Sequence, residues 1–148
     1  MFTLAFGTLD QALRAARSLH QRHSAIQGVL PTTIGPFAAG TLYRANDVAA
    51  LRWVYATLVE TALMAHNLVL PALAAQEREL YYGESRRFAG LFGVPASELP
   101  SDWTGFARYC EAMRQPCSLA VSDATRAIAA QIFVGAGLWV RAPGGTRP

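Results

Sequence analysis

The chain has 148 residues, of which 52% are hydrophobic and 16% charged, and its formal net charge is +3. This length is enough for one domain with a sizeable core, and the composition argues against a disordered chain. All 13 basic residues are arginine, which excludes Schiff-base lysine chemistry and a P-loop. Because only Arg86 and Arg87 are adjacent, no basic stripe indicates a nucleic-acid partner, and none is expected.

The two cysteines, Cys110 and Cys117, have no secretory context. The apolar opening segment, residues 1–7, lacks the basic leader and the cleavage site of a signal peptide. We therefore expect a cytoplasmic protein with two reduced thiols.

The first full helix is predicted over residues 8–27. Thr8 and Gln11 have the spacing of a capping box, apolar residues follow at three- and four-residue steps, and Gly28 is expected to end the helix. Residues 1–6 resemble the end of a preceding apolar helix. Residues 29–46 contain two prolines and two glycines, so this stretch is predicted to be a long loop without regular structure.

A long central helix is predicted from a cap at Asn46 or Asp47 to Pro71. It is apolar nearly all the way round, so it should be buried in the middle of the fold. It is also long enough to cross a bilayer, but charged residues such as Arg52 interrupt it, and no stable membrane span is expected. Four polar residues on it would need buried partners, a ligand or water: Thr57, Glu60, His66 and Asn67.

Three more helices complete the expected fold. One covers residues 73–92 and ends at Gly93, a short one begins after Ser101 or Asp102, and the last runs over residues 123–134 behind Ser122. The tail, residues 141–148, is expected to be frayed. The sequence thus predicts one all-α domain over residues 1–148, an irregular bundle of about five helices around a buried central helix.

His23 is the first candidate for chemistry, because it falls in step with Leu19 and Ile26 on the apolar face of the first helix. A histidine facing a core needs a hydrogen-bond partner or a ligand, so it either bonds a backbone carbonyl or binds a metal. His20 stands three residues earlier, and such a pair can share a metal ion. No cysteine or carboxylate nearby completes a zinc site, and His20 falls toward the solvated flank.

Glu60 is the second candidate, a possible catalytic general base if burial raises its pKa. It shares a helix face with Thr57 and Trp53, and the other interpretation is an ion pair with an arginine of another helix. His66 is interpreted as a structural polar group beside Asn67. No nucleophile or dinucleotide signature is present.

Several segments together resemble the DUF2236 family, which includes the fungal MpaB oxygenase and the rubber oxygenase latex-clearing protein. Their order and spacing agree with the family over about residues 5–130. The segments are Phe6-Gly7, the helix ending at His23, Gly28, Tyr43–Asp47, Arg52–Glu60, Tyr81-Tyr82 with Glu84, Leu91–Pro95, Leu99-Pro100 and Tyr109–Met113.

The resemblance implies an all-helical fold that binds haem b and oxidises an apolar, isoprenoid-like substrate with dioxygen. It places His23 where the rubber oxygenases have their axial haem ligand. The match corresponds to the C-terminal portion of the family's domain, and helices carrying distal-side motifs would precede Met1. Family members often have His where Tyr55 stands and Tyr where His66 stands.

Three functions are therefore carried forward. The first is a haem-dependent oxidoreductase of the dioxygenase type, with His23 as the axial ligand. The second is a truncated, non-catalytic helical module that forms a homodimer or pairs with a partner chain, since residues 1–6 and 128–140 are apolar. The third is a small-molecule hydrolase or isomerase that uses Glu60.

Overall fold

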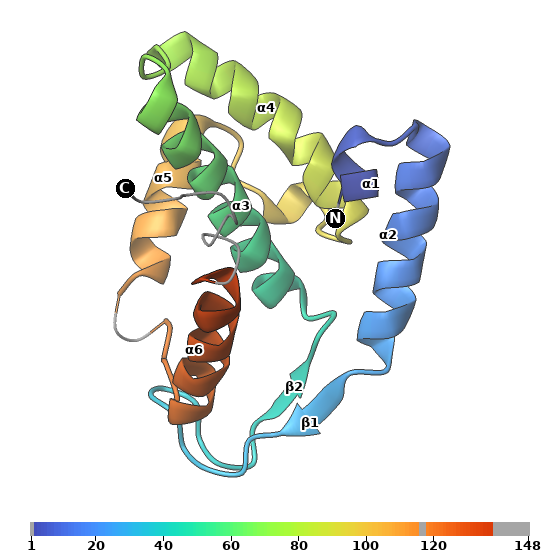
Figure 1. Ribbon diagram of the computed structural model, residues 1–148, viewed down its shortest axis with the longest axis vertical. Helices are drawn as coiled ribbons and strands as arrows, with labels where there is room; N and C mark the ends of the chain where they lie inside the picture. The colour runs from blue at the N-terminus through green and yellow to red at the C-terminus, as the bar shows by residue number, and fades with distance from the viewer. Residues whose placement is uncertain (1, 116–117, 138–148) are drawn as a thin grey trace, which may run out of the picture.

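A computed structural model describes residues 2–115 and 118–137 (Figure 1). The predicted all-α class is confirmed, and the predictions for Cys117 and for residues 138–148 lie outside the described residues. The elements are α1 (Phe2–Phe6), α2 (Leu9–Ser24), β1 (Gln27–Val29), β2 (Leu42–Arg44), α3 (Val48–Val69), α4 (Ala75–Leu91), the 3-10 turn η1 (Ala96–Glu98), α5 (Trp103–Met113) and α6 (Asp123–Gly137).

The helix starts agree with the predicted caps. The capping box of α2 is complete, because the Thr8 side chain accepts from the Gln11 N–H at 3.3 Å and the Gln11 side chain accepts from the Thr8 N–H at 2.8 Å. Asp47 accepts from the Ala50 N–H at 3.0 Å at the start of α3. Similar bonds begin the later helices, with Asp102 accepting from Gly105 and Ser122 from Thr125.

Only some of the helix ends agree with the predicted ends. Helix α3 stops at Val69, just before Pro71, and α4 is followed by Gly93 with a φ of 85°, a backbone conformation that favours glycine. Helix α2 ends at Ser24 rather than at residue 27. Gly28 therefore does not end the helix but lies inside β1.

The prediction of an irregular loop over residues 29–46 is wrong at both ends. Strands β1 and β2 form an antiparallel pair in which Gly28 is opposite Tyr43. Each strand has only three residues, too few to show an alternating pattern in the sequence. The pair forms a ribbon between the end of α2 and the start of α3 (Figure 1).

The core lies where α3 and α4, an antiparallel hairpin, meet α5 (Figure 1). Four side chains are almost fully buried there: Tyr55, Tyr82, Phe106 and Cys110. The rings of Tyr82 and Phe106 lie 4.7 Å apart, and the Tyr82 hydroxyl donates to the carbonyl of Pro100 at 2.9 Å. The buried phenol is thus both packed and hydrogen-bonded, as a buried polar group requires.

Helix α3 is central, but it is buried only in its first half. Leu51, Tyr55 and Val59 belong to the core, whereas Leu68 is 80% exposed and Val69 is 79% exposed. The prediction of a helix buried along its length is therefore wrong for the second half. The reason is that α4 and α5 contact α3 without enclosing its C-terminal turns.

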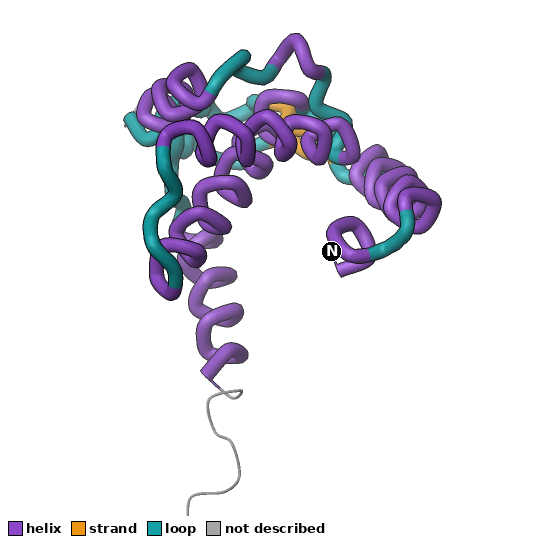
Figure 2. The backbone as a smooth tube through the Cα atoms, turned by 90° about the horizontal axis from the view of Figure 1, so that it is seen from above, coloured by secondary structure: helices purple, strands orange, loops and turns teal. Residues whose placement is uncertain are grey.

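Helices α1 and α2 lie together at one side of the molecule, and α6 leads away from the other side (Figure 2). The junction between α1 and α2 is tight at Gly7, because a Cβ there would come within 2.5 Å of the Thr3 carbonyl oxygen. Helix α2 contacts α4, and the small residues Ala12 and Ala16 of α2 are buried, as is Leu4 of α1.

Within the described part of the chain, α3 is the one helix long and apolar enough to cross a membrane. Core helices of soluble proteins have the same length and composition, so this single helix is weak evidence. The expectation that the chain has no stable membrane span stays a prediction.

Replacing the cap residue of α3 tests how much that helix depends on its first turn. We expect Asp47→Ala to lower the free energy of unfolding by about 1 kcal/mol, because the Ala50 N–H loses its acceptor. Chemical denaturation followed by circular dichroism measures the change. Asp47→Asn is the matched control and should stay near wild type, and equal losses in both variants would contradict the capping role.

Candidate functional site

His23 lies in the last turn of α2, and that turn is tied to the start of α3. The side-chain amide of Asn46 donates to the carbonyl oxygen of His20 at 3.1 Å and to the hydroxyl of Ser24 at 2.9 Å. The Ser24 hydroxyl in turn donates to the same carbonyl at 2.9 Å. These bonds tie the last turn of α2, which carries His23, to the start of α3.

The His23 imidazole itself is half-buried. Within residues 2–115 and 118–137, neither ring nitrogen has a hydrogen-bond partner, and the carbonyl partner considered from the sequence is not found there. A ring nitrogen that solvent reaches, and that has no partner among the described residues, is available to water, a ligand or a metal. No group of three or more His, Cys, Asp or Glu in these ranges could hold a metal ion, whereas axial haem ligation needs one imidazole.

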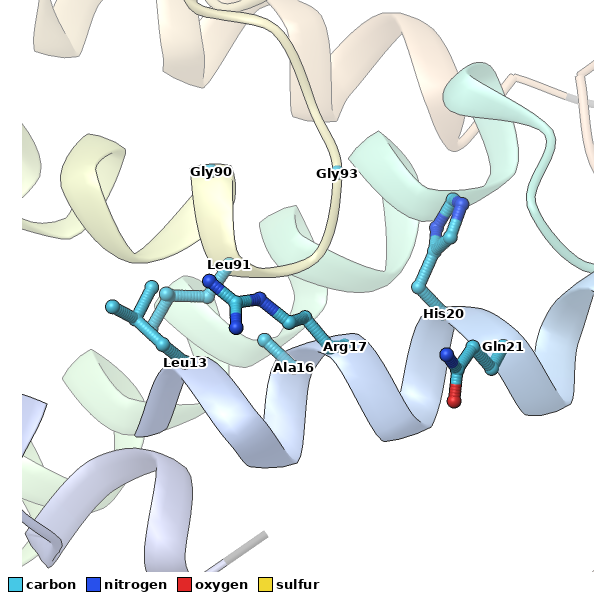
Figure 3. A pocket seen from close by; sticks show the side chains of 8 residues that line it. All are labelled: Leu13, Ala16, Arg17, His20, Gln21, Gly90, Leu91 and Gly93. Atoms are coloured by element: carbon cyan, nitrogen blue, oxygen red, sulfur yellow. The ribbon is translucent and has the colours of Figure 1, made fainter. Parts of the chain in front are cut away.

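His20 belongs to a separate cleft of about 380 Å³ between α2 and α4. It is exposed, as predicted, and it extends from α2 toward the loop with Gly93, while Gln21 points the other way (Figure 3). Most of the lining of this cleft is apolar, and its polar residues Arg17, His20 and Gln21 all come from α2. The lining residues are Leu13, Ala16, Arg17, His20, Gln21, Gly90, Leu91 and Gly93.

Glu60 forms an ion pair with Arg114, which follows α5. The Nη2 of Arg114 lies 2.5 Å from the Oε1 of Glu60, and the side chains are 50% and 28% exposed, respectively. The pairing with an arginine of another helix, one of the two interpretations of Glu60, is therefore present. Glu60 also borders two clefts of about 410 and 420 Å³, so its role as a general base stays a prediction.

The Glu60 carboxylate also affects the pKa of the buried Cys110 thiol. Burial raises the pKa of Cys110 to about 12, and the nearby charge of Glu60 adds to this rise. A thiol with so high a pKa is protonated at neutral pH and is a poor nucleophile. Conversely, the hydrogen bond and charge of Glu60 raise the pKa of Arg114, which stays cationic.

The remaining polar residues of α3 make local contacts. The Nδ1 of half-buried His66 lies 3.3 Å from the Oδ1 of Asn67, and the Thr57 hydroxyl donates to the carbonyl of Val54 at 2.7 Å. These contacts agree with the interpretation of His66 as a structural polar group. Neither residue is brought near His23 by a contact in the described part of the chain.

A larger apolar cleft, of about 810 Å³, lies between α1, α3 and α4. We refer to it as the α3–α4 cleft. Neither Glu60 nor any of the three histidines lines it. Its lining residues are Leu4, Phe6, Tyr55, Leu58, Val59, Ala62, Tyr81, Glu84, Ser85 and Phe88.

Two hydroxyl groups interrupt the apolar lining of this cleft. The oxygens of Tyr55 and Ser85 lie 2.7 Å apart, and the Ser85 hydroxyl also donates to the carbonyl of Tyr82 at 2.8 Å. Burial raises the pKa of Tyr55, and the bond to Ser85 offsets part of this rise. Burial likewise raises the pKa of Tyr81, so both phenols of the cleft stay neutral.

Sequence reasoning did not identify the α3–α4 cleft, although a signal was available. The residues that α3 contributes have the spacing i, i+3, i+4, i+7, from Tyr55 to Ala62. Those of α4 repeat the same spacing from Tyr81 to Phe88. A pattern of this kind on one helix predicts only that the helix has a packed face. A cleft forms only where two such helix faces lie opposite each other and their side chains leave space between them.

These features define an all-helical domain with an apolar cleft between helices, a few polar groups in its lining, and a half-buried imidazole on a neighbouring helix. Clefts of this kind are typical of domains that bind apolar small molecules. The family model described as "ER-bound oxygenase mpaB/B'/Rubber oxygenase, catalytic domain" matches residues 1–147, and the chain belongs to this family of oxygenase catalytic domains. No curated protein and no solved structure matches the chain significantly.

The thiol environment can be tested in a Cys117→Ser background, where Cys110 is the remaining cysteine. We expect no reaction with a thiol reagent at neutral pH until denaturant is added, because the side chain is buried and its pKa is raised. Absorbance of the released chromophore measures the reaction. Adding Glu60→Gln should change little, since burial is the larger cause, and rapid labelling of the folded protein would contradict this account.

Proposed function

We propose that the chain is a haem-b-binding oxygenase domain that oxidises an apolar, isoprenoid-like molecule with dioxygen, with His23 as the axial ligand. The observation that carries the proposal is the half-buried His23 imidazole, without a partner in the described residues, in a member of an oxygenase family. A cytoplasmic location is part of this proposal.

The donor set fits this role. A neutral imidazole is the commonest protein ligand of haem iron, and the Asn46 bonds hold the backbone that presents it. Haem, when bound, would supply the iron that activates dioxygen. The second ring nitrogen would then donate a hydrogen bond to water or to another acceptor, which orients the ring.

The protein's own contribution, in this proposal, is to bind and position the substrate away from water. The α3–α4 cleft offers apolar walls for it, and its phenols stay protonated because burial raises their pKa. Glu60 remains a weaker candidate for moving a proton, since Arg114 holds its carboxylate.

Haem reconstitution tests the axial ligand directly. We expect the wild-type protein to give a Soret band on haem addition and His23→Ala to lose it, because the iron loses its protein ligand. Absorption spectroscopy measures both. His20→Ala is the matched control from the same helix and should keep the band, and an unchanged spectrum in His23→Ala would overturn the assignment.

We propose a second candidate function, a non-catalytic module that forms a homodimer. It is favoured by exposed apolar side chains in the second half of α3 and on α6, including Met64, Leu68, Val69, Ile128 and Ile132. Groups of such side chains on a surface mark interaction sites. If this function holds, the domain associates whether or not haem is present.

Light scattering at micromolar protein concentration tests the homodimer. We expect a dimer for the wild type and a shift to monomer for Leu68→Glu, because a charge on an 80% exposed apolar position opposes burial in an interface. Leu80→Glu on α4 is the control, since Leu80 is also exposed but lies on another helix. A haem-free wild-type monomer would overturn this candidate.

A further inference from the structure

The β-ribbon and its surroundings form an exposed apolar end of the molecule. We call it the ribbon end and define it as residues 26–44, which include β1, β2 and the loop between them, together with residues 119–121. It lies at one end of the long axis, beside the start of α6 (Figure 1). A Cβ at Gly35 would come within 2.5 Å of the Cβ of Ala120, so the two segments are in contact. The large apolar side chains exposed there are Ile26, Val29, Phe37, Leu42, Tyr43, Leu119 and Val121.

The ribbon exposes apolar groups on both of its faces. Val29 and Leu42 are opposite each other in the pairing of β1 with β2, yet they are 57% and 54% exposed. Tyr43 lies on the other face, and Gly28 leaves room for it, since a Cβ at Gly28 would collide with the Tyr43 hydroxyl. A two-stranded ribbon gains little stability by itself, and exposed apolar groups gathered in one place are typical of a contact surface.

The loop between the strands is bonded within itself. The Leu30 N–H donates to the carbonyl of Thr41, and the Gly40 N–H donates to the carbonyl of Leu30, both at 2.9 Å. Ile34 and Phe37 exchange two backbone bonds, at 2.8 and 3.0 Å. Backbone groups that are paired in this way cost less to remove from water, so these bonds lower the cost of placing the loop in an apolar environment.

The charges around the ribbon end indicate the kind of partner. Residues 24–43 contain no charged side chain, and Arg22 and Arg44 stand at the two ends of this stretch. Both arginines are exposed, and neither has an ion-pair partner among the described residues. In the longer stretch of residues 11–46 there are four arginines and no Asp or Glu. An apolar surface bordered by unpaired cations is complementary to an anionic surface that also has an apolar interior.

We propose that the ribbon end binds the surface of an anionic lipid bilayer, with its apolar side chains among the lipids and Arg22 and Arg44 at the headgroups. The apolar groups gain free energy when they leave water, and each arginine near the anionic surface adds attraction. Tyr43 suits such an interface, because its ring is apolar and its hydroxyl is polar. This binding lies on the membrane without spanning it, and it does not depend on haem.

A second copy of the chain is the other occupant that an apolar end could have, and the charges oppose it. Two copies that meet symmetrically through this end would bring Arg22 and Arg44 toward the same arginines of the other copy. The carboxylates next along the chain are Asp47 and Asp123. Asp47 is engaged in capping α3, and Asp123 stands three residues before Arg126 in the first turn of α6.

Co-sedimentation with vesicles tests the proposal on the full chain purified without haem. We expect binding to vesicles of phosphatidylcholine and phosphatidylserine in equal parts, weaker binding to phosphatidylcholine alone, and a loss of this difference at high salt. Arg22→Gln and Arg44→Gln should each lower the partition coefficient onto the anionic vesicles about fivefold, the effect of one cation near such a surface.

Leu42→Glu tests the apolar contact. We expect its partition coefficient to fall about tenfold or more, because an apolar side chain that enters the bilayer is replaced by a charged one. Leu80→Glu is the matched control, since Leu80 is also exposed but lies on α4, and it should bind as wild type does. Thermal melts followed by circular dichroism confirm that each variant is folded before its binding is compared.

A fluorescent label in the loop separates insertion from adhesion by charge alone. Ala38→Cys in a Cys117→Ser background, carrying a nitrobenzoxadiazole group, should become brighter and emit at shorter wavelength when anionic vesicles are added. The same label on Leu80→Cys should not change, because that position stays in water.

Four results would overturn the proposal. They are no binding of the folded wild type to anionic vesicles, equal binding to both kinds of vesicle, equal losses in Leu42→Glu and Leu80→Glu, and a loop label that does not respond. A vesicle-free dimer that Leu42→Glu converts to a monomer would also overturn it, because the ribbon end would then be covered by a second copy. None of these results bears on the Soret band expected from His23.

Discussion

The packing of α3 against α4 and α5 is the constraint on which the rest of the structure depends. Tyr55, Tyr82 and Phe106 are almost completely buried there, and every phenol oxygen among them has a hydrogen-bond partner. An unpaired buried hydroxyl costs more than a hydrogen bond usually gains, so the hydrogen bonds of Tyr55 and Tyr82 are part of what allows this aromatic packing. The same packing leaves the second half of α3 exposed, and it sets the two helix faces that border the α3–α4 cleft.

The local structure of the chain could be predicted well where one or two residues decide it. Thr8 with Gln11 and Asp47 each begin a helix, and Gly93 follows the end of one, because each satisfies orphan backbone groups or adopts a positive φ. The three-residue strands were missed because pairing between residues such as Gly28 and Tyr43 leaves no local pattern.

The tertiary features were harder to predict for a physical reason. The apolar composition of α3 suggested burial all along the helix, but burial depends on which neighbours cover each turn, and Leu68 is left uncovered. The site shows the same limit. His23 and Glu60 could be picked out as candidate site residues from their places on helix faces. An ion pair with an arginine was one of the two interpretations of Glu60. The hydroxyl pair of Tyr55 and Ser85 joins residues 30 positions apart, and only the hairpin brings them together.

His23 and the α3–α4 cleft are formed by different helices, yet they share one structural unit. Leu4 of α1 lines the cleft, and α1 packs against α2, which carries His23. The close approach at Gly7 allows this pairing, and the Asn46 bonds tie the far end of α2 to the start of α3. A shift of α2 would therefore move the imidazole and one wall of the cleft together. In the proposed function, this connection would keep the proposed haem ligand and the proposed substrate space in register, without any residue common to both.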